Sequence, residues 1–220
     1  MARQPLWSIL TRPLIAQNPI TLQILGICSA LAVTTTVATA LTMAASLTVV
    51  LVLAATIIST IRRHVPASIR LIVQIVIVAA LVIVIDQILQ AWFYDISRQL
   101  SVFVSLIATN CLVLGRTESF ALHNPPLPSA VDALGSGLGY SLILVTLGAI
   151  RELFGSGRLM GAQLLATTDQ GGWFTPLNLM LLAPSAFFLL GLLVWAMRAL
   201  RPDQIEPPAA LPPEPGQVQR

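Results

Sequence analysis

The chain has two cysteines, Cys28 and Cys111, and each lies in an apolar segment that holds no charged residue. Cys28 belongs to the segment 20–33 and Cys111 to the segment 100–115, each about ten residues from the start of its segment. A helix rises about 1.5 Å per residue, so the two thiols should reach similar depths. Thiolates bind soft metals and iron–sulfur centres, which usually need four ligands. Two thiols at matched positions therefore indicate half of a metal site, and the other half would have to come from another chain.

Two other interpretations of the cysteines remain open on the residues alone. A cysteine in an apolar segment usually packs as a small hydrophobic side chain. A disulfide between the two thiols is the other alternative, which is disfavoured without an oxidant at that depth. The two histidines, His64 and His123, fall in predicted loops, on the far side of a helix from either thiol. We therefore do not expect this chain to complete a four-ligand site by itself.

The composition predicts an integral membrane protein. Hydrophobic residues make up 56% of the chain and charged residues 10%, with a mean hydropathy of +0.85, whereas soluble domains carry about 25% charged residues. The apolar runs are continuous and do not alternate with polar residues, so they predict helices and argue against a β-barrel. All 12 basic residues are arginines and lie at the ends of apolar runs. Because they form no single patch, they give no reason to expect nucleic-acid binding.

We predict six membrane-spanning helices. About 20 apolar residues cross a bilayer, and the predicted helices are residues 20–33, 38–61, 69–90, 100–115, 133–154 and 177–200. The first and fourth are short, and these two carry the cysteines. Thr34 to Thr36 should form a turn, the prolines of 123–128 a loop, because proline interrupts a helix, and 155–176 a Gly-rich loop. The first segment lacks a signal-peptide cleavage site, so we expect it to be retained.

The positions of the two short helices suggest two related halves. Residues 1–95 would form one unit of three helices, residues 96–201 a second unit, and the Pro-rich residues 202–220 a disordered tail. Three crossings are an odd number, so the second unit would be inverted relative to the first. Inverted repeats with short or broken helices are a known way to build a site at the bilayer midplane. The similarity between the halves is slight, CSALAVT against CLVLGRT, and coincidence in a hydrophobic chain is the alternative.

The arginines predict the orientation in the membrane. With six crossings, both termini and two of the loops share one side. That side holds nine arginines, namely Arg3, Arg12, Arg62, Arg63, Arg70, Arg116, Arg198, Arg201 and Arg220. The other side holds three, namely Arg98, Arg151 and Arg158. Because cytoplasmic loops carry the excess of basic residues, both termini are expected in the cytoplasm.

Two acidic residues are candidates for an ion pathway. Asp86 lies near the end of the third predicted helix, and an acidic side chain at membrane depth is a functional candidate by default. The alternative for Asp86 is an interfacial carboxylate that is solvated or paired with Arg98. Asp132 opens the fifth predicted helix, where an acidic residue more simply stabilises the helix N-terminus.

Residues next to the cysteines are candidates to support a metal site. Gly26 would let the backbone approach closely, and Asn110 would donate a hydrogen bond to a sulfur; packing is the alternative for both. The glycines of 135–139 head an apolar helix that no strand precedes, so they predict close helix packing and not a nucleotide site. Arg151 and Glu152 are expected to form an interfacial pair.

Five blocks of the sequence carry a resemblance to a known family. They are NPITLQILGICSALAVTT, IRRHVPASIRLIVQIVI, QLSVFVSLIATNCLVLGRTESFA, LGYSLILVTLGAIRELFGSG and GGWFTPLNLMLLAPSAFF. They closely resemble the family of the D subunit of the bacterial sodium-translocating NADH:quinone reductase (Na⁺-NQR), over about residues 17–206. The related Rnf complexes have a paralogous E subunit with a similar pattern around the second cysteine. The segment GICSALAVTT, with Ser29 after the cysteine, looks more like the Na⁺-NQR version, and the tail after Glu206 departs from the family.

The resemblance implies a six-helix protein that pairs with a homologous, oppositely oriented E subunit, in a complex with the A, B, C and F subunits. Each of the pair would give two thiols to one [2Fe-2S] cluster inside the membrane, and Cys28 and Cys111 match the family ligands. The cluster would relay electrons between a cytoplasmic flavin and iron–sulfur subunit and flavins on the other side. The family reaction combines NADH oxidation, ubiquinone reduction and outward Na⁺ transport across the bacterial inner membrane. No flavin, NADH or quinone site is expected on this chain.

Two other functions stay open at this point. One is the Rnf version, in which the same cluster would serve ferredoxin and NAD as the redox couple. The other is a passive six-helix scaffold or ion-conducting protein, in which the cysteines are packing residues.

Overall fold

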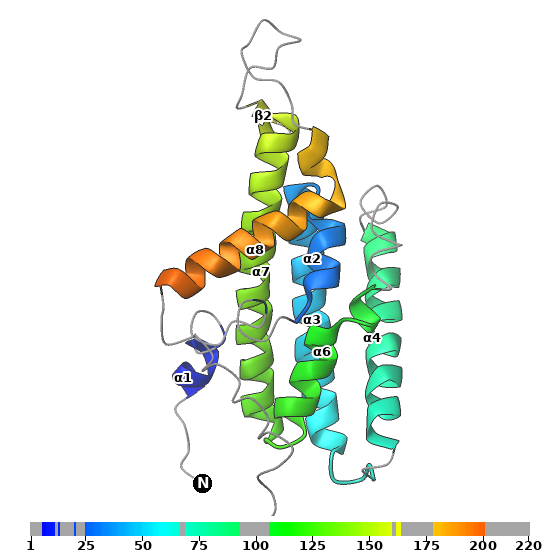
Figure 1. Cartoon of the computed structure of the whole chain (residues 1–220). Helices are drawn as coiled ribbons and strands as arrows, with labels where there is room; N and C mark the ends of the chain where they lie inside the picture. The colour runs from blue at the N-terminus through cyan, green and yellow to red at the C-terminus, as the bar shows by residue number, and fades with distance from the viewer. Residues whose placement is uncertain are drawn as a thin grey trace, which may run out of the picture.

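Three long helices form the frame of the computed structural model, which describes residues 6–11, 13, 20, 25–66, 69–92, 106–159, 162–163 and 178–200. These helices are α3 (Val37–Ile61), α4 (Arg70–Trp92) and α7 (Pro126–Ser156), and they stand side by side in Figure 1. Each contains a stretch that is long and apolar enough to cross a membrane. They correspond to the second, third and fifth predicted helices, so the all-helical membrane class is confirmed at this level.

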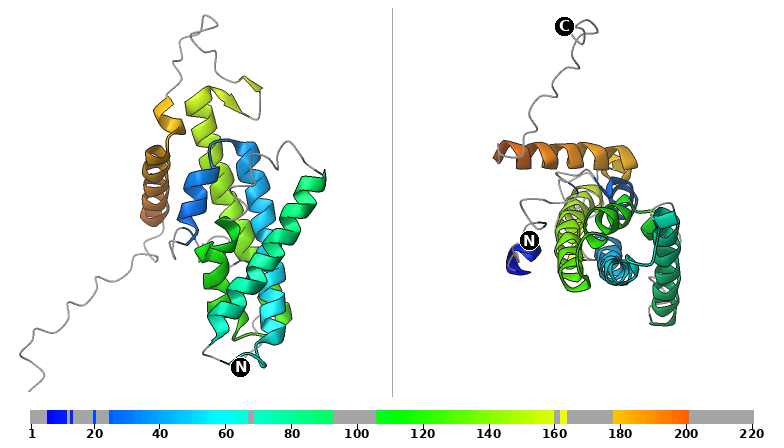
Figure 2. Two further views of the ribbon diagram at one scale, coloured as in Figure 1. Left: turned by 90° about the vertical axis from the view of Figure 1, so that its right-hand side faces the viewer. Right: turned by 90° about the horizontal axis from the view of Figure 1, so that it is seen from below.

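Two short helices lie in the middle of the bundle. Helix α2 (Ile27–Val33) follows Gly26 and ends at the predicted threonine turn, and α6 (Cys111–Arg116) follows Asn110. Helix α2 leads into α3 at one end of the bundle, whereas α6 continues through the π-helical turn η3 (Thr117–Ala121) towards α7 at the other end. The two short helices therefore run in opposite directions, and their N-terminal ends face each other near mid-height (Figures 1 and 2).

Helix α7 begins earlier than the sequence predicted. It starts at Pro126, directly after Pro125, and Pro128 lies in its first turn. Proline is tolerated in a first turn because the N–H groups there have no partner within the helix. The predicted loop over 123–128 is therefore wrong from Pro126 onward.

The C-terminal part of the described chain departs most from the predicted spans. Within the predicted Gly-rich loop, two-residue strands β1 (Arg158–Leu159) and β2 (Ala162–Gln163) pair in antiparallel fashion. After the 3₁₀ turn η5 (Asn178–Leu181), α8 (Ala183–Leu200) has an apolar stretch, 184–199, that is shorter than the about 20 residues of a full crossing. Figures 1 and 2 show α8 lying across α2 and α7, at a steep angle to the long helices.

The described residues thus hold three helices of spanning length, and the predicted first and fourth crossings lie partly outside them. The predicted boundary between the two units, at residues 95 and 96, also lies outside the described residues. The predicted tail, 202–220, does so too. The inverted six-helix arrangement consequently stays a prediction.

Small residues of α7 allow its close packing. A Cβ placed on Gly137 would lie 2.7 Å from the Thr48 side chain of α3. Gly135 faces the backbone of α1 (Leu6–Thr11), where a Cβ would lie 2.6 Å from the Leu10 carbonyl oxygen. Side chains larger than hydrogen would separate these elements, which confirms that the glycine cluster serves helix packing.

Two charged residues of α7 hold the corner between α2 and α3. The Arg151 guanidinium is fully buried and donates to Leu31 O (3.3 Å) and Thr34 Oγ1 (2.6 Å), as well as to two backbone carbonyls just before α8. Glu152 accepts from the Val37 N–H at the start of α3 (2.7 Å). The predicted interfacial pair of Arg151 with Glu152 stays a prediction. The two side chains are buried because the ends of α2 and α3 leave backbone groups that need partners.

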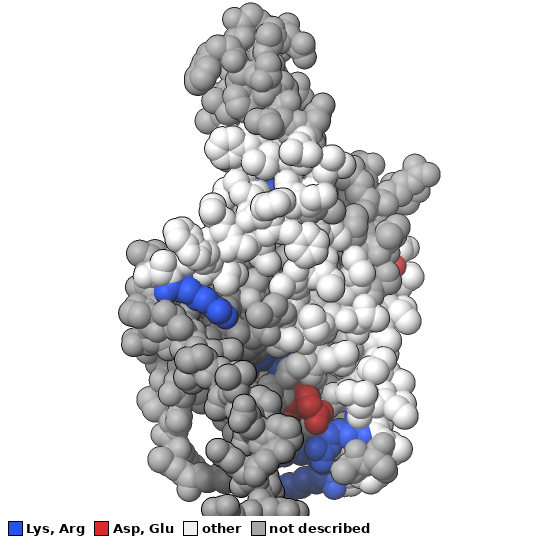
Figure 3. Space-filling model, in the orientation of Figure 1, with Lys and Arg blue, Asp and Glu red and all other residues white. Residues whose placement is uncertain are grey.

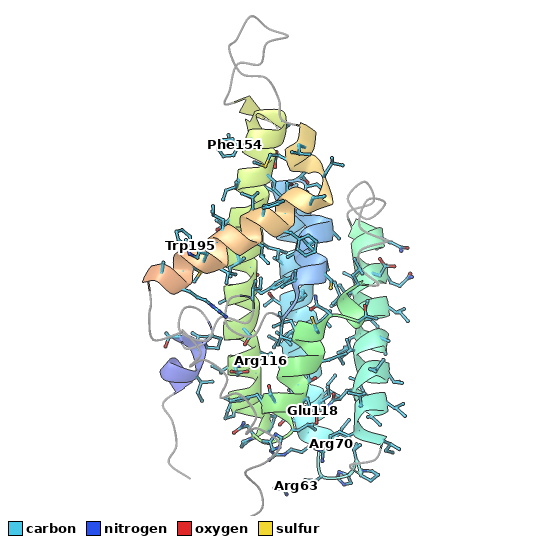
Figure 4. All side chains as sticks on the ribbon, viewed as in Figure 1. Arg63, Arg70, Arg116, Glu118, Phe154 and Trp195 are labelled. Atoms are coloured by element: carbon cyan, nitrogen blue, oxygen red, sulfur yellow. The ribbon has the colours of Figure 1, made fainter. Side chains whose placement is uncertain are left out.

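The outward faces of α4 and α8 are strongly apolar. Their exposed large side chains include Leu71, Ile72, Val76, Ile83, Val84, Ile88, Phe187, Phe188, Leu192 and Trp195. Several arginines gather at the lower end of the bundle in Figure 3, while others lie nearer its middle, and Figure 4 places Arg63 and Arg70 at the lower end, far from Phe154. This grouping agrees with the predicted assignment of Arg63 and Arg70 to one side of the membrane.

Candidate metal centre

The two cysteines line one pocket. Cys28 is the second residue of α2 and Cys111 the first of α6, so the facing helix starts bring both side chains to the same place. Both thiols are free and exposed. The pocket has a volume of about 40 Å³, and its lining residues are Gly26, Cys28, Ser29, Leu106, Thr109, Asn110 and Cys111. Two thiols that are far apart in the sequence therefore open into a common space.

A backbone amide before α2 contacts the sulfur at the start of α6. The Gly26 N–H donates to Sγ of Cys111 with an N···S distance of 3.0 Å. Gly26 has φ of +83°, in the left-handed region that side chains with a Cβ rarely adopt. This conformation directs the amide of one segment at the thiol of the other. A hydrogen bond from an N–H group stabilises negative charge on a sulfur.

Ser29 connects both cysteine segments to α7. Its Oγ donates to Gly26 O (2.9 Å), accepts from Asn110 Nδ2 (2.9 Å) and lies 2.6 Å from the hydroxyl oxygen of Tyr140. A hydroxyl offers one donor and two acceptor positions. Since its proton goes to Gly26, the Tyr140 hydroxyl must donate to Ser29. Ser29 then uses its full hydrogen-bonding capacity in a buried network.

Asn110 is the N-cap of α6 and the link between the two segments. Its Oδ1 accepts from the Leu112 N–H (2.9 Å), which leaves Nδ2 to donate to Ser29. The cap therefore fixes which end of the amide faces α2. Asn110 was expected to donate to a sulfur, but the Gly26 N–H reaches the Cys111 sulfur instead.

The pocket suits a thiolate-bound cluster in its donor chemistry. Two thiols supply soft ligands, and a backbone N–H already points at one of them. Within the described ranges, no group of three or more His, Cys, Asp or Glu side chains comes together. His64 and His123 lie in turns outside the helices, as predicted. A four-thiolate group at this pocket would thus need two ligands from another chain.

The two acidic candidates do not line this pocket. Asp132 is buried and forms a bidentate ion pair with Arg116 of α6, in which Arg116 Nε lies 3.2 Å from Asp132 Oδ2. Its predicted role as a helix N-terminal acid is wrong, because α7 begins six residues earlier, at Pro126. Asp86 is partly exposed on α4 and accepts from Gln90 Nε2 (2.8 Å). Its predicted alternative partner, Arg98, lies outside the described residues.

The sequence of residues 6–194 matches a family model described as "Rnf-Nqr subunit, membrane protein". The chain belongs to the Rnf-Nqr family. A protein of Pseudomonas paraeruginosa (strain DSM 24068 / PA7) is named as the D subunit of the Na(+)-translocating NADH-quinone reductase. This chain is 57% identical to it over 210 residues, an alignment that covers 95% of this chain and 94% of that protein. It is 57% identical over 198 residues to the protein of the same name from Yersinia enterocolitica (serotype O:8 / biotype 1B), which covers 90% of this chain and 95% of that protein. The resemblance seen in the sequence is thereby confirmed.

The sequence analysis missed two side chains around the site of this Rnf-Nqr protein. Ser29 was predicted only as a residue typical of the family, and Tyr140 was given no role at the site. A tyrosine in the middle of an apolar helix is a usable signal, because a buried hydroxyl usually has a hydrogen-bond partner. Which partner it finds depends on the fold, since Ser29 is more than a hundred residues away.

Replacing Gly26 by alanine should destabilise this Rnf-Nqr protein by about 1–2 kcal/mol from the left-handed backbone alone. The added Cβ would also lie 2.9 Å from Cε2 of Tyr140, so the Tyr140 ring must move. Thermal unfolding in detergent measures the loss. Gly191→Ala is the matched control, because a Cβ on Gly191 meets nothing within 4 Å. Equal stability of the two variants would contradict the described turn.

Proposed function

We propose that this chain is the D-type membrane subunit of a Na⁺-translocating NADH:quinone reductase, and that it relays electrons through a [2Fe-2S] cluster shared with a homologous E subunit. The names of the relatives support the enzyme assignment. The observation that carries the cluster assignment is the pocket between α2 and α6, where Cys28 and Cys111 meet. This chain offers two of the four thiolates that such a cluster needs, which is why the proposal includes a partner.

The residues of this chain would act by binding and positioning. Cys28 and Cys111 would each provide one thiolate ligand, and the Gly26 N–H would stabilise charge on the Cys111 sulfur. The bound cluster would supply one-electron redox chemistry within the membrane. Asn110 and Ser29 would keep the two ligand-bearing helix starts together through their mutual hydrogen bond.

The proposal also includes the arrangement of this chain in the membrane and its partner subunits. The antiparallel course of α2–α3 and α6–α7 supports two inverted units of three helices, as predicted for residues 1–95 and 96–201. The position of Arg63 and Arg70 at one end of the bundle supports cytoplasmic termini in a bacterial inner membrane. Besides the E subunit, the partners would be the A, B, C and F subunits, which would carry the NADH, flavin and ubiquinone sites.

Two alternative functions make different predictions. An Rnf-type complex would hold the same cluster but use ferredoxin and NAD, and the match to a joint Rnf-Nqr family model is compatible with it. A scaffold or ion-conducting protein would hold no cluster. The proteins that co-purify with this chain distinguish an Rnf-type complex from our proposal. Iron analysis distinguishes a scaffold or ion-conducting protein from it.

The proposal is tested on the complex purified through a tag on this chain. We expect bound iron, an electron paramagnetic resonance signal of a reduced [2Fe-2S] cluster between this chain and its homologous partner, and Na⁺-stimulated NADH:ubiquinone reductase activity. A complex with ferredoxin:NAD activity instead would support the Rnf version. A complex with quinone reductase activity but no cluster signal attributable to this chain would disprove the relay.

Asp86 and Asp132 remain our proposed contacts of an ion pathway. Arg116 already neutralises Asp132, so Asp86 is the more available carboxylate; its Oδ1 has no hydrogen-bond partner among the described residues. We expect Asp86→Ala to raise the Na⁺ concentration for half-maximal turnover by about tenfold, on the order of 1.5 kcal/mol. Gln90→Ala, which keeps the carboxylate, is the control. An unchanged Na⁺ dependence in Asp86→Ala would remove Asp86 from the pathway.

A further inference from the structure

We propose that Tyr140 of α7 is a positioning residue that holds Cys28 and Cys111 in the relative arrangement needed for the cluster. This inference rests on the proposed function, because it assigns Tyr140 a part in binding that same cluster. Tyr140 acts through Gly26 and Ser29, which it contacts directly, and not as a ligand of iron.

Tyr140 contacts the chain on both sides of Cys28. Its hydroxyl oxygen lies 2.6 Å from Oγ of Ser29, the residue directly after Cys28, and the two hydroxyls share a hydrogen bond. Its ring packs against Gly26, two residues before Cys28, so closely that a Cβ there would lie 2.9 Å from Cε2. Tyr140 is completely buried, and α7 is fixed against α3 through its glycines. One rigid side chain therefore fixes the short segment that carries the first thiol.

The Tyr140 hydroxyl also helps to position Cys111, through Ser29 and Asn110. Ser29 accepts from Asn110, and Asn110 both precedes Cys111 and caps α6. With Tyr140 and Asn110 donating and Gly26 accepting, Ser29 has one possible orientation. If the Tyr140 hydroxyl is removed, Ser29 loses one of its three hydrogen-bond partners, and its hydrogen bond with Asn110, which joins the two cysteine segments, is held less firmly.

Loss of the Tyr140 hydroxyl should weaken the hydrogen bond that the Cys111 sulfur accepts from the Gly26 N–H. The Gly26 N–H reaches Sγ at 3.0 Å because Gly26 is held between the Tyr140 ring and the Ser29 hydroxyl. Hydrogen bonds to ligand sulfurs help to set the reduction potential of iron–sulfur clusters. Outer-shell partners of metal ligands are typically worth about 10- to 100-fold in metal affinity. Tyr140 should therefore affect both the reduction potential of the cluster and its affinity for iron without binding iron itself.

The test compares Tyr140→Phe with Ser141→Ala in the purified complex. Tyr140→Phe keeps the ring and removes the hydroxyl. Ser141→Ala removes the neighbouring hydroxyl of α7, which donates to the Gly137 carbonyl of its own helix. We expect Tyr140→Phe to lose iron at a chelator concentration about 10- to 100-fold lower than the wild type. Its cluster should also have a lower midpoint potential, because the more negative reduced form loses stabilisation. Ser141→Ala should match the wild type in both readouts.

The outcomes separate this inference from the function it rests on. An iron-loaded wild type with unchanged chelator resistance and potential in Tyr140→Phe would overturn the positioning role alone. A wild-type complex without a cluster at this chain would overturn the proposed function and this inference together. If Tyr140→Phe fails to assemble, Ser29→Ala removes the hydroxyl that Tyr140 binds and is expected to give the same two changes; wild-type behaviour of Ser29→Ala would overturn the role.

Discussion

Replacing Cys28 or Cys111 by alanine should reduce NADH:ubiquinone reductase turnover of the complex to background, with loss of the cluster signal of this chain. Each cysteine would supply one of four thiolate ligands, and both side chains open into the same pocket. A three-thiolate set leaves a coordination position open, so we expect loss of the cluster and interruption of the electron path. The two single variants should behave alike, because neither thiol can replace the other from its own helix.

Turnover and electron paramagnetic resonance of the purified complexes measure this effect. Thr109→Ala is the matched control, since Thr109 lines the same pocket but offers no sulfur ligand. The control should keep both the signal and the turnover. If Cys28→Ala retains wild-type turnover and an unchanged signal, the cysteines are packing residues and the scaffold interpretation is the correct one.

The second large effect is expected at the buried ion pair between α6 and α7. Asp132 binds Arg116 through both carboxylate oxygens, and the Arg116 guanidinium also lies 5.9 Å from the centroid of the Phe120 ring. Both charged residues are buried, at 4% exposure for Asp132 and 8% for Arg116. Asp132→Ala leaves the Arg116 charge buried without its carboxylate, which should lower the free energy of unfolding by about 3–5 kcal/mol.

The double variant Arg116→Met/Asp132→Leu distinguishes the cause. Replacing both members of a buried ion pair by apolar residues is often close to neutral, so the double variant should be more stable than Asp132→Ala. Ser119→Ala, at an exposed position on the same segment, should change stability by less than about 0.5 kcal/mol. Denaturant titration in detergent gives all three values. Wild-type stability of Asp132→Ala would show that the pair is not structural and would favour a role of Asp132 with ions.

The long helices were predictable from the sequence because their signal is local. Residues 37–61 and 70–92 are almost continuously apolar, and chain length and polarity suffice to predict a crossing. The early start of α7 escaped prediction because the prolines at 125, 126 and 128 resemble a loop when they are read in sequence alone. Proline in a first turn costs no hydrogen bond, so the preceding loop is shorter than predicted.

The cysteine pair was predictable as a pattern, but its surroundings were not. Matched positions in two short apolar segments suggested that Cys28 and Cys111 belong together. The Tyr140 contact could not be deduced, because it depends on how α7 packs beside the facing starts of α2 and α6. Arg151 shows the same limit: its sequence did not indicate that its guanidinium would donate to a carbonyl and a hydroxyl at the end of another helix.

The most direct test is a cryo-electron microscopy map of the whole complex at the pocket between α2 and α6. We predict metal density that contacts Sγ of both Cys28 and Cys111, together with two sulfur ligands from an adjacent protein of the complex. A map in which the two sulfurs lie far apart, or face lipid with no metal between the chains, would contradict the proposed electron relay.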